Sequence, residues 1–201
     1  NEDLILHHEG VYLIGMMNRY GEHFLNEHTS LFGIRFRPGA LSFFYNYESL
    51  HHLANRISEF HQNKFPDIRQ VIKRNVAYLD GFFLNRLTEP RNSLAPILLD
   101  IQNRKGQLVM DDLIRKHLIT ARQLERYFQS QVGISPKAFM NIVRFTDTMQ
   151  RLKQRKSGES IMEIAFDCGY YDHAHLSRDI RQYTGMTPGQ IILSDFSKLT
   201  V

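Results

Sequence analysis

Apolar residues recur at three- and four-residue spacings through the second half of the chain, and this period indicates amphipathic helices. The predicted helices span residues 94–103, 110–117, 121–131, 136–154, 161–168, 173–183 and 188–193. Polar residues that can cap a first turn precede four of them: Thr120, Ser135, Ser160 and Asp172. Glycines stand where the chain leaves three of them: Gly133, Gly169 and Gly185. From residue 94 onward, the pattern therefore predicts helices only.

The first half of the chain has a mixed pattern. Residues 11–20 and 30–41 combine β-branched and aromatic residues with partial alternation, so both segments are predicted strands. Residues 48–60 and 66–87 return to helical spacing and predict two helices. Such helices would form an antiparallel pair or a dimerisation surface.

A short polar segment broken by Pro90, residues 88–93, is the expected linker. It divides the chain into a small α+β region at residues 1–90 and an all-helical domain at residues 91–201. The fold class is therefore predicted as mainly α, with two helix-turn-helix units joined by a long helix in the second domain.

Residues 110–133 and 161–185 repeat one plan: a short helix, a tight turn and a longer helix that ends near glycine. In the second copy, Ala165 permits the two helices to cross closely and Gly169 turns the chain at little steric cost. Leu176 and Ile180 are the predicted anchors of its longer helix. The residues expected to face outward are His173, Ala174, His175, Ser177, Arg178 and Arg181.

Outward Arg, Ser and His side chains at the start of a helix suit a DNA major groove, where arginine binds guanine bidentately. The first copy has Ile114 and Leu118 at the positions of the small residue and the glycine, so its turn is expected to differ slightly. Its longer helix would be anchored by Leu124 and Phe128. The side chains that it would expose to the groove are Arg122, Glu125 and Arg126.

The helix predicted at residues 136–154 is about 28 Å long, close to the approximately 34 Å between successive major-groove faces. One chain is therefore expected to read two adjacent groove segments. Cations at the end of this helix could approach phosphates: Arg151, Lys153, Arg155 and Lys156.

Charge is distributed unevenly along the chain. Residues 1–90 carry nine Lys and Arg against ten Asp and Glu, whereas residues 91–201 carry sixteen against eleven. A basic surplus in the helical half favours a polyanionic partner, since neutralising phosphates releases counterions from nucleic acid. No apolar run is long enough to cross a membrane and no secretory signal opens the chain, while a single cysteine, Cys168, fits a reducing cytoplasm.

The segment IMEIAFDCGYYDHAHLSRDIRQYTGMTP, residues 161–188, resembles the signature of the AraC/XylS family of bacterial transcription regulators. The junction from Gly133 to Pro136, with Phe139 and Arg144, is similar to the family's connecting helix. The resemblance covers about residues 94–193. It implies that seven residues occupy DNA-contacting positions: Arg122, Glu125, Arg126, His173, His175, Ser177 and Arg178. The chain departs from the family at three positions where small residues are usual: Ile114, Leu118 and Thr148.

Residues 28–41, HTSLFGIRFRPGAL, resemble the last strands of a cupin-like sensor domain. Only about 45 residues precede the first predicted helix, too few for a complete barrel. We therefore expect either a fragment of a longer protein or a domain that has lost strands. Double-stranded DNA is the expected partner; RNA polymerase, a small-molecule effector and a second copy bound through residues 48–87 are further candidates.

Two other functions compete with DNA reading. A regulatory adapter would keep this fold but act through protein contacts, since its first unit has drifted at Ile114 and Leu118. An enzyme is disfavoured because the sequence shows no nucleophile motif, phosphate loop or catalytic carboxylate pair. The ten histidines lack a complete set of ligands at structural-zinc spacing, so neither a metal nor a cofactor is predicted.

Overall fold

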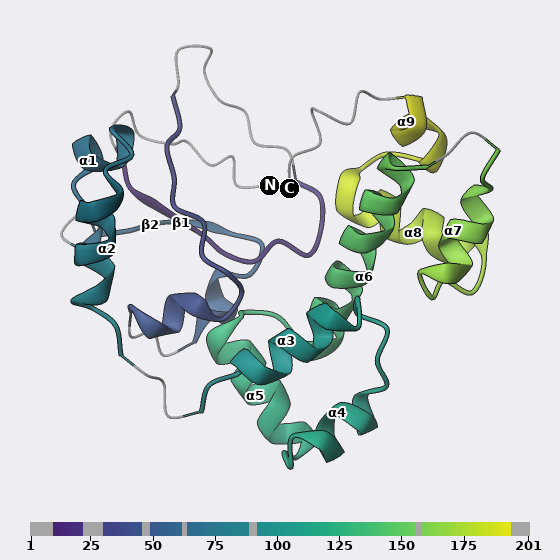
Figure 1. The fold of residues 1–201 in the computed structure, drawn as a ribbon, viewed down its shortest axis with the longest axis horizontal. Helices are drawn as coiled ribbons and strands as arrows, with labels where there is room; N and C mark the ends of the chain where they lie inside the picture. The colour runs from purple at the N-terminus through teal and green to yellow at the C-terminus, as the bar shows by residue number, and fades with distance from the viewer. Residues whose placement is uncertain are drawn as a thin grey trace. The chain divides into compact units, whose positions relative to one another are not determined.

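The computed structural model describes residues 10–21, 30–45, 49–61, 64–88, 92–155 and 158–193. These residues are mainly helical, as the sequence predicts, and their one sheet has two short strands. In chain order the elements are β1 (Tyr12–Ile14), 3₁₀ helices at Ala40–Phe43 and Leu50–Leu53, β2 (Ile57–Glu59), α1 (Ile68–Ile72), α2 (Val76–Leu84), α3 (Ala95–Asn103), α4 (Met110–Lys116), α5 (Ala121–Gln131), α6 (Pro136–Lys153), α7 (Ile161–Asp167), α8 (His173–Thr184) and α9 (Pro188–Leu193) (Figure 1).

The elements group into two compact units, which are described separately. The first unit takes residues from the ranges 1–17, 22–96 and 125–134, and the second from 18–21, 97–124 and 135–201. The division into domains at residues 90 and 91 stays a prediction.

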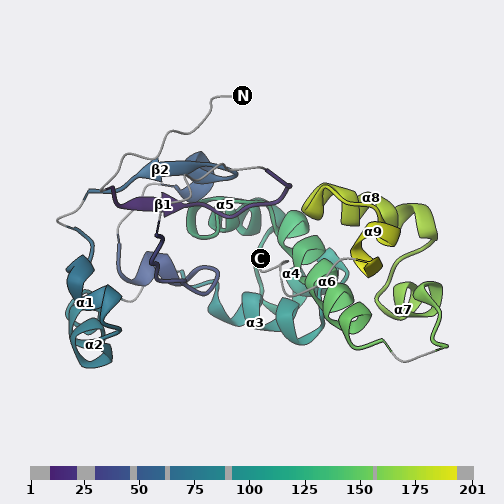
Figure 2. The same ribbon diagram turned by 90° about the horizontal axis from the view of Figure 1, so that it is seen from above.

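In the first unit, β1 and β2 pair antiparallel, with Tyr12 opposite Glu59 and Ile14 opposite Ile57. Figures 1 and 2 show the two strands side by side. Aromatic rings cluster beside them: the ring centroids of Phe44 and Phe83 are 5.2 Å apart, and those of Tyr45 and Phe60 are 5.4 Å apart. Edge-to-face rings of this kind supply much of the apolar contact of a small unit.

Two sequence predictions in this unit are wrong. Residues 30–41 form no strand, because residues 30–37 have no regular structure and a 3₁₀ helix begins at Ala40 after Gly39 adopts a left-handed φ of 76°. Residues 48–60 form no α-helix. Their described part contains a 3₁₀ helix and then β2, whose partner β1 lies more than forty residues earlier. Pairing with a distant strand has overridden the local apolar spacing.

Two further predictions hold in part. The strand predicted over residues 11–20 is present only as β1. The helix predicted over residues 66–87 is broken into α1 and α2, because Arg74 adopts a left-handed φ of 51°. Asp67 and Asn75 accept hydrogen bonds from the first-turn amides of Arg69 and Tyr78, so each short helix has its own N-cap.

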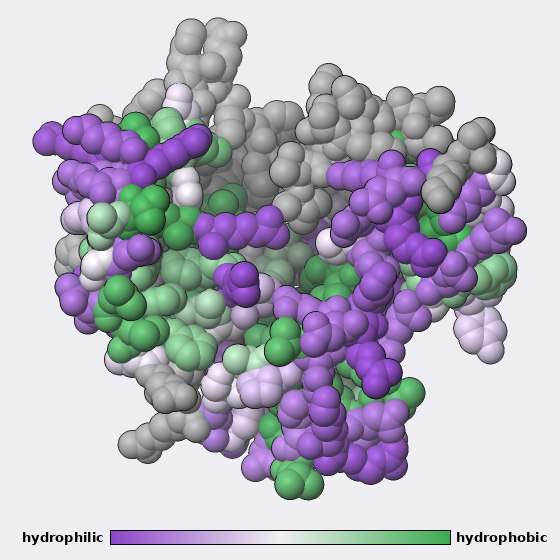
Figure 3. All heavy atoms as spheres, viewed as in Figure 1, coloured by the Kyte–Doolittle hydropathy of each residue, from purple (hydrophilic) through white to green (hydrophobic). Residues whose placement is uncertain are grey.

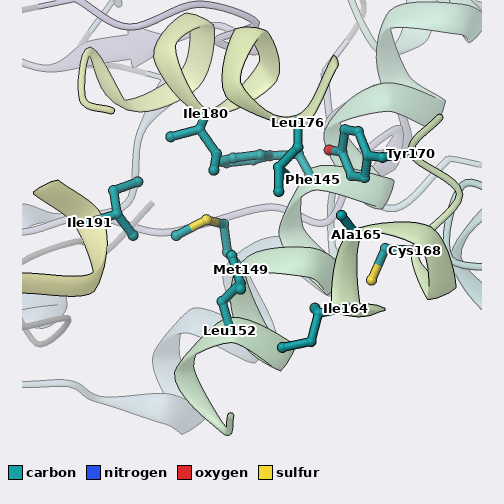
Figure 4. Packing of buried hydrophobic residues seen from close by; sticks show 10 residues of the cluster. All are labelled: Phe145, Met149, Leu152, Ile164, Ala165, Cys168, Tyr170, Leu176, Ile180 and Ile191. Carbon is teal, nitrogen blue, oxygen red and sulfur yellow. The ribbon is translucent and has the colours of Figure 1, made fainter. Parts of the chain in front are cut away.

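All seven helices predicted from residue 94 onward are present, with their ends within one residue of the predicted bounds. In the second unit, α6, α7, α8 and α9 direct apolar side chains toward one another (Figure 4). The buried cluster consists of Phe145, Met149, Leu152, Ile164, Ala165, Cys168, Tyr170, Leu176, Ile180 and Ile191. Removal of these side chains from water holds the helices together.

Gly106 brings the loop after α3 against α6. Its φ of 72° is left-handed, and a Cβ atom here would collide with the backbone carbonyl of Met140. The same loop contributes an ion pair between Lys105 Nζ and Asp147 Oδ1 at 3.0 Å and a hydrogen bond from Gln107 Nε2 to the Asp167 carbonyl at 3.1 Å. The loop thus joins the middle of α6 to the end of α7.

Candidate nucleic-acid interface

The second helix-turn-helix consists of α7, a turn and α8. A capping box starts α7: Ser160 accepts from the Met162 amide, and Glu163 accepts from the Ser160 amide at 3.0 Å. At the turn, Gly169 has a φ of 78° and the Tyr170 amide donates to the Ala165 carbonyl at 2.9 Å. This is the closure expected of a helix that ends on a left-handed residue.

The start of α8 is fixed by Asp172, whose carboxylate accepts from the His175 amide at 2.6 Å. All four N-caps predicted from the sequence make such a bond: Thr120, Ser135, Ser160 and Asp172. Side-chain oxygens satisfy first-turn amides that have no partner inside the helix. The beginnings of both longer helices are therefore set by local sequence.

Successive residues of a helix are rotated by about 100°, and this divides α8 into two faces. Leu176 and Ile180 are fully buried, as predicted for anchors. Among the predicted contact residues, His173, Arg178 and Arg181 are exposed and Ser177 is partly buried. Ser177 Oγ lies 3.1 Å from His173 Nδ1, and Arg178 Nε donates to the Ala174 carbonyl at 3.3 Å.

His175 differs from the expectation that it faces outward. It is partly buried, and Arg144 Nη2 on α6 donates to its Nε2 atom at 3.2 Å. The same Nη2 atom lies 3.1 Å from Asp179 Oδ2. Residues 175 and 179 are one helical turn apart, so their side chains meet the same guanidinium on α6. A guanidinium only donates, so the ring nitrogen of His175 that faces α6 is already used as an acceptor.

Tyr170 completes this group. Its ring centroid lies 4.6 Å from Arg144 Cζ and 4.9 Å from the His175 ring. Burial, followed by the nearby Asp179 carboxylate, raises the pKa of the Tyr170 phenol well above its usual value. Sequence reasoning missed this group, although an aspartate on the apolar side of a helix signals a buried partner.

The first helix-turn-helix consists of α4, a turn and α5. Leu118 occupies the place of Gly169 and adopts the same left-handed conformation, with a φ of 50°. The Ile119 amide donates to the Ile114 carbonyl at 3.2 Å, as Tyr170 does to Ala165. The predicted difference between the turns lies in their length: four residues separate α4 from α5, against five between α7 and α8.

On α5, the predicted anchors Leu124 and Phe128 are fully buried, while Arg122 and Arg126 are exposed. Glu125 is partly buried and accepts a hydrogen bond from Gln129 Nε2 at 2.9 Å. The predicted contact residues of this helix therefore include two exposed cations and one carboxylate that is already engaged.

The end of α4 is tied to α3 by Asp100. Its Oδ2 atom lies 2.7 Å from Lys116 Nζ and 2.6 Å from His117 Nε2. The hydrogen bond from Lys116, and next the one from His117, hold the pKa of the Asp100 carboxyl below its usual value. This cluster fixes the helix that precedes the first turn.

The cations predicted to approach phosphates have different surroundings. Arg151 Nη2 is paired with Asp167 Oδ2 at 2.9 Å, so it joins α6 to α7. Lys153 and Arg155 are exposed, and Lys156 lies outside the described residues. Thr148 is fully buried without cost, since its hydroxyl donates to the Arg144 carbonyl at 2.8 Å.

Cys168 is buried, with its Sγ atom 3.7 Å from Arg151 Nη1 and 3.8 Å from Asp147 Oδ2. Within the described ranges, no group of three His, Cys, Asp or Glu residues is placed to hold a metal ion. His7, His8, His23 and His28 lie outside those ranges. No helix in the described part of the chain is both long enough and apolar enough to cross a membrane.

Two helix-turn-helix units, each with a well-anchored second helix, define the class of domain. Residues 114–192 match the model of a helix-turn-helix domain, and residues 1–59 match a domain of unknown function, DUF6597. The regulator MtrA of Neisseria gonorrhoeae is 32% identical over 81 residues, which are 40% of this chain and 26% of MtrA. The regulator GbdR of Pseudomonas aeruginosa is 34% identical over 86 residues, covering 43% of this chain and 23% of GbdR.

The transcriptional activator RhaS of Klebsiella pneumoniae is 29% identical over 137 residues, covering 62% of this chain and 47% of RhaS. Among solved structures, ToxT of Vibrio cholerae aligns with a TM-score of 0.45 and 13% identity over 68% of this chain and 57% of ToxT. The matched part thus spans about a quarter of the length of MtrA and GbdR and under half of RhaS.

Residues 114–192 are therefore similar to a helix-turn-helix domain, in agreement with the two units of the fold. The relatives named above carry the names of transcriptional regulators or activators. The cupin-like resemblance of the N-terminal part stays a prediction, because its match is to a domain without an assigned function.

Proposed function

We propose that the protein is a sequence-specific DNA-binding transcription regulator and that α8 reads bases in the major groove. The observation that carries this proposal is the solvent-facing surface of α8, where His173, Arg178 and Arg181 are exposed and Ser177 is partly exposed, while Leu176 and Ile180 are buried. Arginine binds guanine bidentately, and histidine and serine reach base edges or phosphates. His175 is left out of the contact set, since its ring is engaged by Arg144.

The proposal extends to a second groove segment read by α5 through Arg122 and Arg126, with Glu125 at the edge of the same face. The connecting helix α6 has 18 residues and is about 27 Å long, close to the approximately 34 Å between successive major-groove faces. Lys153 and Arg155 are the proposed phosphate contacts at its end, because both are exposed. Residues 91–201 would be the DNA-binding domain.

The remaining partners are proposals as well. Exposed apolar residues of α1, α2 and the turn after α2 suit the predicted contact with a second copy: Ile68, Ile72, Val76, Leu84 and Leu87. Figure 3 shows hydrophobic residues on the visible surface in the region of these helices. Residues 1–59 would respond to an effector, and RNA polymerase would be contacted at the promoter. A regulator of this kind works in the cytoplasm, where bacterial DNA lies.

Selection of duplexes from a random pool by the full chain tests the proposal. We expect enrichment of one sequence, bound at least about 10³-fold more tightly than an unrelated duplex at the same salt concentration. Arg178→Ala should weaken the free energy of binding to the selected duplex by about 1–3 kcal/mol and relax the preference at one base pair. The matched control Arg155→Ala should weaken all duplexes alike. Equal affinity of the wild-type chain for every duplex would contradict the proposal.

A regulatory adapter is the second candidate. The side chain of Leu118, at the turn of the first unit, is 95% exposed, and Tyr171, at the turn of the second, is 91% exposed. Large exposed apolar side chains suit protein contacts better than water. A chain that binds heparin through its basic surplus but retains no duplex in the selection would favour the adapter.

A further inference from the structure

Arg144 lies near the middle of α6, and its charged end is buried against the turn and the inner side of α8. Only 12% of its side chain is exposed, and the same holds for Asp179. One Nη2 atom serves both His175 and Asp179, at 3.2 and 3.1 Å, while Cζ stands 4.6 Å from the centroid of Tyr170. A single guanidinium thus contacts α8 at two points and the turn before it at a third.

This arrangement is costly. In the described part of the chain, the buried Arg144 Nε atom has no hydrogen-bond partner. Unsatisfied buried polar atoms are few in native proteins, and apolar residues of similar volume often replace a buried ion pair without loss of stability. Stability alone therefore does not account for the charges at this place. The apolar cluster around Leu176 and Ile180 already holds α8 against α6.

The charged groups add a directional contact between α6 and α8. Apolar contacts are not directional, so Leu176 and Ile180 permit small rotations of α8 about its axis. Residues 175 and 179 are one helical turn apart, and a planar guanidinium that bonds both fixes that rotation. A binding site must be held within about 10–20° of its productive geometry. Arg178 and Arg181 are exposed on the same helix, so the rotation sets where they point.

We propose that Arg144 is a positioning residue for base reading: with His175 and Asp179 it fixes the rotation of α8, and so sets sequence specificity without contacting DNA. This inference rests on the proposed function. It assigns His175 to orientation of the reading helix rather than to the groove.

The test removes both charges at once, because removal of one would leave the other buried and unpaired. The double variant Arg144→Met with Asp179→Leu, made in the full chain, is compared with wild type. The matched control, Arg151→Met with Asp167→Leu, removes the ion pair that joins α6 to α7. Affinities are measured at one salt concentration for the duplex selected by the wild-type chain and for an unrelated duplex of equal length.

For Arg144→Met with Asp179→Leu, we expect a melting temperature within a few degrees of wild type. Affinity for the selected duplex should fall about tenfold, and affinity for the unrelated duplex should stay within about twofold. The control should change both affinities by the same factor. Arg144→Lys keeps the charge without the planar fork, so it should lose part of the preference.

Three results would overturn the inference. An unchanged ratio of the two affinities would show that the network does not orient the reading face. An equal loss for both duplexes would place Arg144 in phosphate binding. Loss of cooperative melting in the double variant would make the network a requirement of the fold. Failure of the proposed function is distinguishable, since the wild-type chain itself would then prefer no duplex.

Discussion

Leu118 adopts a backbone conformation that is less favourable for leucine than for glycine. Its left-handed φ of 50° is unfavourable for a residue with a Cβ atom, by about 1–2 kcal/mol, and its side chain makes little contact because it is 95% exposed. Leu118→Gly should therefore stabilise the chain by about 0.5–1 kcal/mol, once the greater freedom of glycine in the unfolded state is subtracted. Urea denaturation measures the difference.

The reciprocal change at the equivalent position is the control. Gly169→Ala should destabilise the chain by about 1–2 kcal/mol, because alanine meets the same left-handed backbone at a φ of 78°. A lower stability for Leu118→Gly would contradict the prediction and show that the leucine side chain makes a stabilising contact.

At this scale the sequence predicts local chemistry well. Ser135, Ser160 and Asp172 cap their helices as expected, because capping depends on residues two or three positions away. Arg144 and His175 are 31 residues apart, and no local pattern reveals that they meet. At 100° per residue, His175 is turned about 100° from Leu176 and about 140° from Ile180, so helix periodicity places it away from the anchors and does not reveal this contact.

Among the elements, α7 offers a direct test of local stabilisation. The Ser160 hydroxyl accepts a hydrogen bond from the Met162 amide at 3.2 Å. The Ser160 amide in turn donates to the Glu163 carboxylate, which completes the capping box. Ser160→Ala should lower the free energy of unfolding by about 1 kcal/mol, since an amide of the first turn loses its partner. Ser160→Thr retains a hydroxyl and should lose much less. If alanine and threonine behave alike in urea denaturation, the cap does not stabilise α7.

The contrast between the two halves of the chain has one physical cause. Helices α3 to α9 bury apolar side chains at helical spacing, and α5 to α8 begin at side-chain caps, so local sequence specifies them. The spacing of Leu50, Leu53 and Ile57 fits a helix equally well, yet Ile57 pairs with Ile14 across the sheet. Strand pairing is a non-local choice, and a single sequence does not show which distant segment a strand will meet.

For the whole molecule, alkaline pH should weaken folding through buried phenols. Burial, and next the Asp179 carboxylate, raises the pKa of Tyr183 to about 12, whereas an unfolded tyrosine titrates near 10. Between these values the unfolded chain releases its proton first, so stability present below pH 10 is lost as the pH rises toward 12. Tyr183→Phe should make this loss smaller by about 1 kcal/mol after allowance for solvent screening.

Urea denaturation at several pH values from 9 to 12 measures this loss. The control Tyr171→Phe replaces a phenol that is 91% exposed, and its pH curve should follow that of wild type. A curve for Tyr183→Phe that runs parallel to wild type over the whole range would show that the folded chain does not hold this phenol neutral.

The spacing of the two reading helices makes the most demanding prediction for the molecule as a whole. Since α6 is a single helix of 18 residues between the two helix-turn-helix units, the proposed function requires two half-elements about one helical turn of DNA apart. Insertion of about five base pairs between them turns one half-element to the opposite side of the duplex. Affinity should then fall nearly to that of a duplex with one half-element.

Insertion of about ten base pairs returns both half-elements to the same side of the duplex but doubles the distance between them. Since α6 cannot span that distance, the affinity should stay low. A gel-shift series with spacers of increasing length measures both effects. Arg126→Ala should lower the affinity for the original duplex. It should leave the affinity for a duplex with only the α8 half-element unchanged. Equal affinity at every spacer length would mean that α8 alone reads DNA. The first unit, which has Ile114 and Leu118 where small residues are usual, would then have lost this role.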